Sequence, residues 1–125
     1  MPPKRNWHDD DMRFQCHACE AVLTREVLDT PTEPCEKDGQ DLVPEGVALR
    51  FCSWSDGQWV INAKDNLSMQ LTRDSERLSG CCDVSGCDGP NLVCGTCGAE
   101  VATARYDCWM PRHIVMVDER IEVVG

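Results

Sequence analysis

Residues Gly80–Trp109, GCCDVSGCDGPNLVCGTCGAEVATARYDCW, are the most informative part of the chain and the basis for its interpretation. This stretch holds six of the ten cysteines and includes Cys94-Gly-Thr-Cys97. Two thiols separated by two residues are typical of a zinc site or of a redox disulfide. The stretch therefore predicts either metal binding or thiol chemistry.

A second C-x-x-C motif, Cys16-His-Ala-Cys19, lies near the start of the chain and has similar flanks. Each copy follows apolar residues and leads into a short apolar segment that ends near a threonine. Zn²⁺ prefers four thiolates in a tetrahedron, so we interpret the copies as two zinc knuckles that form one Cys₄ site. Its ligands are Cys16, Cys19, Cys94 and Cys97. Two independent redox motifs are the alternative, although neither copy precedes the helical pattern of a thioredoxin-type motif.

The segment between the knuckles, residues 20–93, is too long for a classical zinc ribbon and must fold as a body of its own. Its regular pieces are short and mostly of strand type, with turn signals about every ten residues. The fold class expected is therefore mainly β: a small antiparallel β domain closed by the two C-x-x-C zinc knuckles. We expect one domain over residues 12–125 and a flexible N-terminal arm over residues 1–11.

Individual elements follow from local patterns. Alternating residues and the turn Ser55-Asp56-Gly57 predict a hairpin over residues 47–62. Residues 67–71 are predicted as a short helix, and residues 74–78 as one helical turn stopped by Gly80. The last strands, over residues 113–117 and 121–124, are expected to pair with each other as a hairpin.

The formal net charge of −10 limits the choice of partners. Nucleic-acid binding needs a basic surface that releases counterions from phosphates, and the twelve Lys and Arg do not cluster. Binding to nucleic acid or to an acidic membrane surface is therefore not expected, whereas a protein partner with a basic patch is. No apolar run is long enough to span a membrane, and residues 1–14 lack the apolar region of a signal peptide. We expect a cytoplasmic protein with reduced thiols; a disulfide framework is the alternative.

The remaining cysteines suggest a second metal site. Its candidate ligands are Cys81, Cys82, Cys87 and Cys108. The vicinal pair Cys81-Cys82 cannot easily bind one ion with both sulfurs, so we expect one of the two to point elsewhere. Cys35 and Cys52 are assigned no role. One Zn²⁺ is expected, and a second is an open alternative.

Two distant knuckles around a β body resemble the β-tent group, which includes yippee proteins, the thalidomide-binding domain of cereblon and B-type methionine sulfoxide reductases. The resemblance rests on F-x-C-x-x-C from Phe14 and on C-G-x-C-G from Cys94. It implies that the four knuckle cysteines bind structural zinc. The pattern GCC…DGPN…CxxCGxEVAT…DCW also resembles a group of short uncharacterised bacterial proteins, which implies no activity.

Three functions follow from the motifs and the resemblance. The preferred one is a non-catalytic zinc-binding module that mediates protein interaction. Arg105-Tyr106-Asp107-Cys108 resembles the reductase nucleophile segment, with an additional Asp, and implies a thiol oxidoreductase that uses Cys108. The cereblon-type tryptophan cage implies a small-ligand binder, with a pocket formed by Trp54, Trp59 and Trp109. The oligomeric state does not follow from the sequence.

Overall fold

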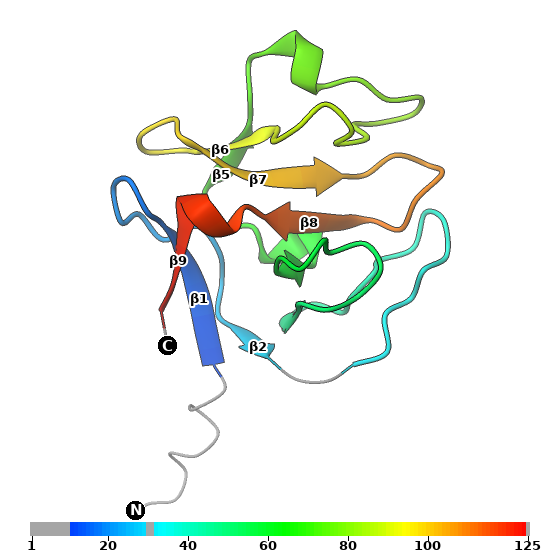
Figure 1. Cartoon of the computed structure of the whole chain (residues 1–125), viewed down its shortest axis with the longest axis horizontal. Coiled ribbons are helices and arrows are strands. Elements are labelled where there is room, and N and C mark those ends of the chain that lie inside the picture. Colours follow the sequence, from blue (N-terminus) through cyan, green and yellow to red (C-terminus); the bar gives the residue numbers. More distant parts are fainter. Residues whose placement is uncertain (1–10, 30–31, 125) are drawn as a thin grey trace, which may run out of the picture.

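The computed structural model describes residues 11–29 and 32–124 as a mainly β protein without an α-helix in those ranges (Figure 1). The strands are β1 Asp11–Cys16, β2 Val27–Asp29, β3 Val47–Leu49, β4 Val60–Ile61, β5 Met69–Leu71, β6 Leu92–Cys94, β7 Glu100–Arg105, β8 His113–Met116 and β9 Ile121–Val124. Three 3₁₀ helices connect them: η2 Ala63–Asp65, η3 Ser75–Arg77 and η4 Asp118–Arg120. Within residues 11–29 and 32–124, no helix has the length and apolar character that crossing a membrane requires.

One sheet of nine strands has the order β5-β6-β7-β8-β4-β3-β2-β1-β9. Figure 1 shows β7 and β8 side by side and β1 and β9 crossing their direction, so the sheet turns strongly between its two ends. Every pair is antiparallel except β2 and β3, which are parallel. The sheet is therefore mixed, and the expected antiparallel arrangement holds for every pair of strands except this one. A parallel pair needs a long connection, and the loop after β2 supplies it.

Buried side chains from almost every strand form the main core, and β7 and β8 contribute most completely. The rings of Phe14 and Trp59 pack together with centroids 6.0 Å apart. A smaller cluster lies under the long loop. It consists of Leu42, Val43, Val60 and Val115. Asn62 donates from its side-chain amide to the Val43 carbonyl at 2.9 Å, which holds this loop against the sheet.

The predicted hairpin over residues 47–62 is confirmed, because Ala48 pairs with Ile61 and Leu49 with Val60. Its strands are shorter than expected: β3 ends at Leu49, and Phe51 is 88% exposed in the following turn. The helical turn after Asp74 is also confirmed, since the Asp74 side chain accepts from the Glu76 N–H.

Two predictions about secondary structure were wrong. Residues 67–71 do not form a helix: residues 67 and 68 lie in a bend, and Met69–Leu71 form β5. The Asn66 side chain hydrogen-bonds both backbone groups of Met69 and so directs the chain into this strand. The last two strands do not form a hairpin. β8 pairs with β7 and β4, whereas η4 redirects the chain so that β9 pairs with β1.

The predicted arm over residues 1–11 lies outside the described residues except for Asp11, which begins β1. The strand β1 that follows alternates regularly between buried and partly buried residues, as expected for a strand with one face on the core.

A buried polar side chain completes the ladder between β6 and β7. The register of these strands shifts between Leu92 and Val93. Just before the shift, the fully buried Asn91 side chain accepts from the Ala104 N–H at 2.6 Å and donates to the Ala104 carbonyl at 3.0 Å. Asn91 thus satisfies two buried backbone groups as a strand neighbour would.

We predict that Asn91→Ala destabilises the protein by about 2–4 kcal/mol, because it leaves an N–H and a carbonyl of Ala104 without partners in the core. Urea unfolding followed by circular dichroism measures this effect. Gln70→Ala, an exposed change on the nearby β5, should stay within about 0.5 kcal/mol of wild type. Equal stability of the two variants would contradict the role given to Asn91.

Candidate metal centre

Each C-x-x-C motif begins at the last residue of a strand: Cys16 ends β1 and Cys94 ends β6. The loops that follow these strands lie on the same side of the molecule (Figure 1). The four sulfurs of Cys16, Cys19, Cys94 and Cys97 lie within 4.8 Å of one another. The sequence-predicted ligand set is therefore brought together by the fold.

The two knuckles have the same backbone hydrogen bonds. In the first, the Glu20 N–H donates to the Cys16 carbonyl at 2.7 Å, and the Cys16 N–H donates to the Ala21 carbonyl at 2.9 Å. The corresponding bonds in the second join Gly98 to Cys94 at 2.9 Å and Cys94 to Ala99 at 2.8 Å.

The fifth residue of each turn has a left-handed backbone, with φ of 65° at Glu20 and 79° at Gly98. Such a conformation costs little at glycine but is strained at glutamate. The two motifs thus adopt one local structure in spite of their different sequences.

Neighbouring segments fix each knuckle from outside. The His17 N–H donates to the Arg120 carbonyl in η4 at 3.0 Å, and the Gly95 N–H donates to the Ser68 carbonyl at 3.0 Å. Ser68 also contacts the other knuckle arm, because its hydroxyl donates to the Val22 carbonyl at 2.6 Å. The segment before β5 therefore connects the two knuckles through Ser68.

The sulfur positions fit tetrahedral coordination. The Cys16–Cys97 and Cys19–Cys94 sulfurs are each 3.6 Å apart. Four thiolates about 2.3 Å from a zinc ion would be about 3.8 Å from one another. The donor set and its spacing therefore suit Zn²⁺.

Backbone N–H groups lower the cost of ionising the thiols. The N–H groups of Ala18 and Cys19 point at the Cys16 sulfur, and those of Thr96 and Cys97 point at the Cys94 sulfur. Burial raises the pKa of Cys94, but the N–H groups of Cys97 and Thr96 and the neighbouring thiols outweigh it and lower that pKa to about 7.

The other two thiols with resolved shifts behave differently. Burial raises the pKa of Cys16. The Ala21 N–H lowers the pKa of Cys19, but burial and the thiols of Cys94, Cys97 and Cys16 together raise it to about 12. Of these three thiols, Cys94 is thus the one whose pKa is lowered.

Comparison of the chain with family models, with curated proteins and with solved structures finds no match. The interpretation of the site therefore depends on its own geometry.

The proposed second ligand set is only partly brought together. The sulfurs of Cys81, Cys82 and Cys108 lie within 4.8 Å of one another, so this group could also hold a metal ion. Cys87 is exposed in the same loop but is not in the group. Both members of the vicinal pair Cys81-Cys82 take part, contrary to expectation. All ten cysteines lie within the described residues, and none forms a disulfide.

The three tryptophans of the proposed ligand pocket have different neighbours. Trp59 is buried against Phe14, with Arg50 over its ring at 5.1 Å. Trp54 packs on the buried His113 at 5.8 Å between ring centroids. Trp109 is 49% exposed, and its indole N–H donates to Asp107 at 2.9 Å.

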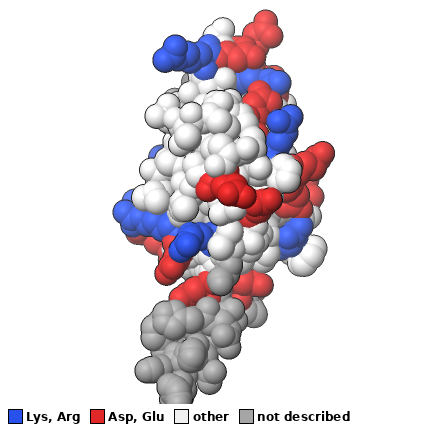
Figure 2. All heavy atoms as spheres, turned by 90° about the vertical axis from the view of Figure 1, so that its left-hand side faces the viewer, with Lys and Arg blue, Asp and Glu red and all other residues white. Residues whose placement is uncertain are grey.

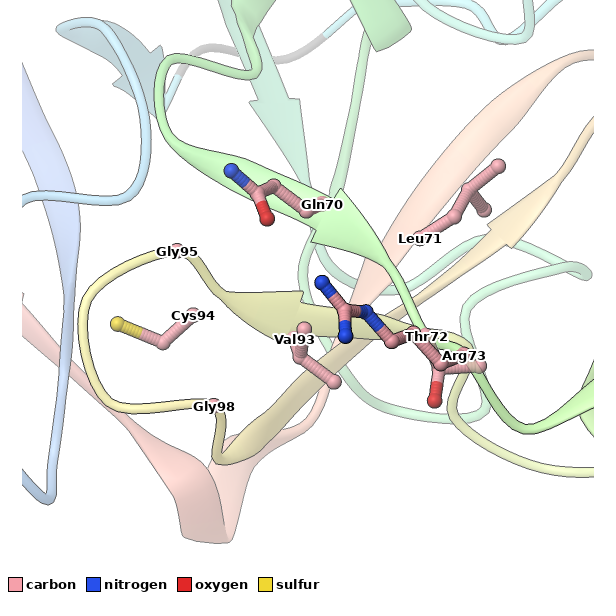
Figure 3. A pocket seen from close by; sticks show the side chains of 8 residues that line it. All are labelled: Gln70, Leu71, Thr72, Arg73, Val93, Cys94, Gly95 and Gly98. Atoms are coloured by element: carbon pink, nitrogen blue, oxygen red, sulfur yellow. The ribbon is translucent and has the colours of Figure 1, made fainter.

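A pocket with a volume of about 310 Å³ lies instead beside the second knuckle, over β5 and β6 (Figure 3). Its lining comprises Gln70, Leu71, Thr72, Arg73, Val93, Cys94, Gly95 and Gly98. The view in Figure 3 shows the Cys94 sulfur directed into the knuckle loop between Gly95 and Gly98. This pocket was not anticipated, because nothing in the local sequence indicates that β5 lies next to the knuckle.

The second knuckle lies close against the segment before β5 at Gly95. A Cβ atom at Gly95 would lie 2.4 Å from the Ser68 carbonyl oxygen, a backbone atom that cannot rotate away. The glycine therefore permits the close approach of the knuckle to the segment before β5.

We predict that Gly95→Ala destabilises the zinc-loaded protein by about 1–3 kcal/mol, as expected for overpacking against a fixed backbone. Thermal unfolding and the rate of zinc loss to a chromophoric chelator measure the effect. Thr96→Ala, one residue later on the exposed surface of the same knuckle, is the matched control and should resemble wild type. If Gly95→Ala unfolds and loses zinc as wild type does, the contact between Gly95 and Ser68 does not hold the knuckle in place.

Proposed function

We propose that the protein is a non-catalytic, zinc-dependent binding module whose Cys₄ site is formed by Cys16, Cys19, Cys94 and Cys97. The observation that carries the proposal is the matched geometry of the two knuckles, which places four thiols at a spacing suited to one ion. When bound, zinc would connect the end of β1 to the end of β6, which are far apart in the sequence. Its role in this proposal is structural, as in the β-tent group that the sequence resembles.

The proposed partner is a protein with a basic surface. The charge of −10 supports this choice, and nucleic acid is not proposed because the basic residues do not cluster. Figure 2 views the molecule from the side of the knuckle loops and shows a broad uncharged area bordered by acidic and basic groups. We propose this area as the docking face and the cytoplasm as the location. A partner bound there would make few ion pairs at the centre and more at the edge.

The enzymatic alternative would use Cys108 as a nucleophile. A reactive thiol needs a lowered pKa, usually from a nearby cation or base. Here the hydrogen bond with the Cys82 thiol is the main cause that raises the pKa of Cys108, and with burial and the neighbouring thiols it reaches about 12. These observations favour a thiol without catalytic reactivity.

The two cations closest to Cys108 in sequence interact elsewhere. Arg105 donates to the Trp54 carbonyl at 2.9 Å and lies 3.5 Å from the Asp56 carboxylate. Arg112 lies over the Tyr106 ring at 4.4 Å. Their other contacts make both poor candidates for stabilising a Cys108 thiolate.

We predict that the purified protein retains zinc and that Cys94→Ser abolishes cooperative unfolding, because three thiolates remain where four are needed. Elemental analysis and thermal melting followed by circular dichroism test both points. Cys35→Ser, which changes an exposed loop thiol outside both thiol groups, should melt within a few degrees of wild type. Cys94→Ser protein that melts like wild type would refute a structural role for the metal.

We also predict that the protein does not reduce methionine sulfoxide with dithiothreitol as the electron donor. Product analysis by chromatography checks this with wild type and Cys108→Ser side by side. Turnover that disappears in Cys108→Ser, with melting temperature and knuckle-bound zinc unchanged, would replace the binding module with the enzyme.

A further inference from the structure

A second group of thiols, distinct from the knuckle site, joins two segments that are distant in sequence. Cys81 and Cys82 lie in the loop after η3, and Cys108 lies in the turn after β7. Both segments are on the side of the molecule away from the knuckle loops (Figure 1). The three sulfurs lie within 4.8 Å of one another, and all three residues are exposed. The group is therefore accessible to an ion from solution.

A buried carboxylate organises this group. Asp107, whose exposed fraction is 1%, accepts hydrogen bonds from the N–H of each of the three cysteines. The distances are 2.8 Å from Cys81, 2.9 Å from Cys82 and 2.8 Å from Cys108. A fourth donor, the Trp109 indole N–H, lies at 2.9 Å. One side chain thus fixes the backbone of every thiol in the group.

Three backbone N–H groups and one indole N–H surround the Asp107 carboxylate. With three of its four hydrogen bonds directed to backbone N–H groups, the carboxylate acts as a support beneath the thiols. Its negative charge also favours a cation at the nearby sulfurs.

The loop is anchored on both sides of the vicinal pair. A Cβ atom at Gly80 would lie 1.7 Å from the Asp83 carbonyl oxygen, so only glycine permits this tight turn. Val84 is buried in the main core, and its carbonyl accepts from the Tyr106 N–H at 2.8 Å. These contacts hold the loop against the turn that carries Cys108, and the thiols are positioned before any ion binds.

We propose that Cys81, Cys82 and Cys108 form a second metal site, which binds a thiophilic d¹⁰ ion through three thiolates and leaves one side open to solvent. Thiolate ligands select zinc and monovalent copper among the common metals. Zn²⁺ is the ion we assign, because a divalent cation offsets more of the charge of three thiolates beside Asp107. A water molecule would then complete the tetrahedron. Binding displaces the thiol protons to solvent.

The two sites should differ in exchange. The knuckle site offers four ligands, two of them on buried residues, whereas the second site offers three ligands on exposed residues. A zinc ion in the second site should therefore exchange faster and be removed first by a chelator.

Native mass spectrometry of full-length protein, reduced and supplied with Zn²⁺, tests the assignment. We expect two zinc ions per wild-type chain and one in Cys82→Ser and in Cys108→Ser. Cys87→Ser is the matched control, because it removes an exposed thiol from the same loop outside the group, and it should keep two. A chromophoric chelator should remove one zinc from wild type quickly and the other slowly, and only the slow phase should remain in Cys108→Ser.

Three results would overturn the proposal: one zinc in wild type, two zinc ions in both Cys82→Ser and Cys108→Ser, or a loss in Cys87→Ser equal to theirs. Melting temperatures close to wild type would show that the variants are folded. Supplying monovalent copper in place of zinc tests which ion the second site prefers. If this site retains copper in preference to zinc, the zinc assignment is refuted. If Cys94→Ser still holds the zinc ion that the chelator removes slowly, this result contradicts the knuckle site and not the second site.

Discussion

The meeting of the four knuckle thiols is the constraint on which the remaining structure depends. Cys16 and Cys94 end strands at opposite parts of the sheet order, and no backbone ladder joins β1 to β6 directly. The sheet must turn on itself to bring their sulfurs together. Each knuckle also receives a hydrogen bond from a neighbouring segment, through Arg120 or Ser68. A metal ion bound by these thiols would therefore stabilise the same arrangement as the sheet curvature, and the loss of either would weaken the other.

Buried polar groups have a second organising role. Asn91 completes the ladder where β6 and β7 change register, and Asp107 satisfies four donors in two loops. In both cases one side chain replaces several backbone interactions that irregular segments cannot make among themselves. A protein with short strands and long loops depends on such residues more than a protein of long strands does.

The meeting of the four knuckle thiols could be predicted because the C-x-x-C motif encodes its own turn, and a site of four thiolates would require two such motifs to meet. Local alternation likewise identified the hairpin of β3 and β4. The role of Asp107 could not be predicted, since its partners Cys81 and Cys82 are distant in sequence and an acid beside a cysteine usually signals repulsion. The strand partner of β9 was missed for a related reason: proximity favoured β8, but pairing with β1 is set by the whole sheet. Leu67–Leu71 resembled a helix until the side-chain bonds of Asn66 were known.

The position of β9 beside β1 has a consequence for biosynthesis. Residues 11–16 leave the ribosome well before their strand partner at residues 121–124 and before the second pair of knuckle thiols. The native contacts of β1 are thus largely non-local, a property that slows folding in small proteins. Until the later segments emerge, the nascent chain presents unprotected thiols and the strand edge of β1 that β9 later covers, and such exposed edges make folding intermediates prone to aggregation. Zinc bound by the first knuckle alone would not produce the native structure. The chain can reach that structure only after β9 has been synthesised.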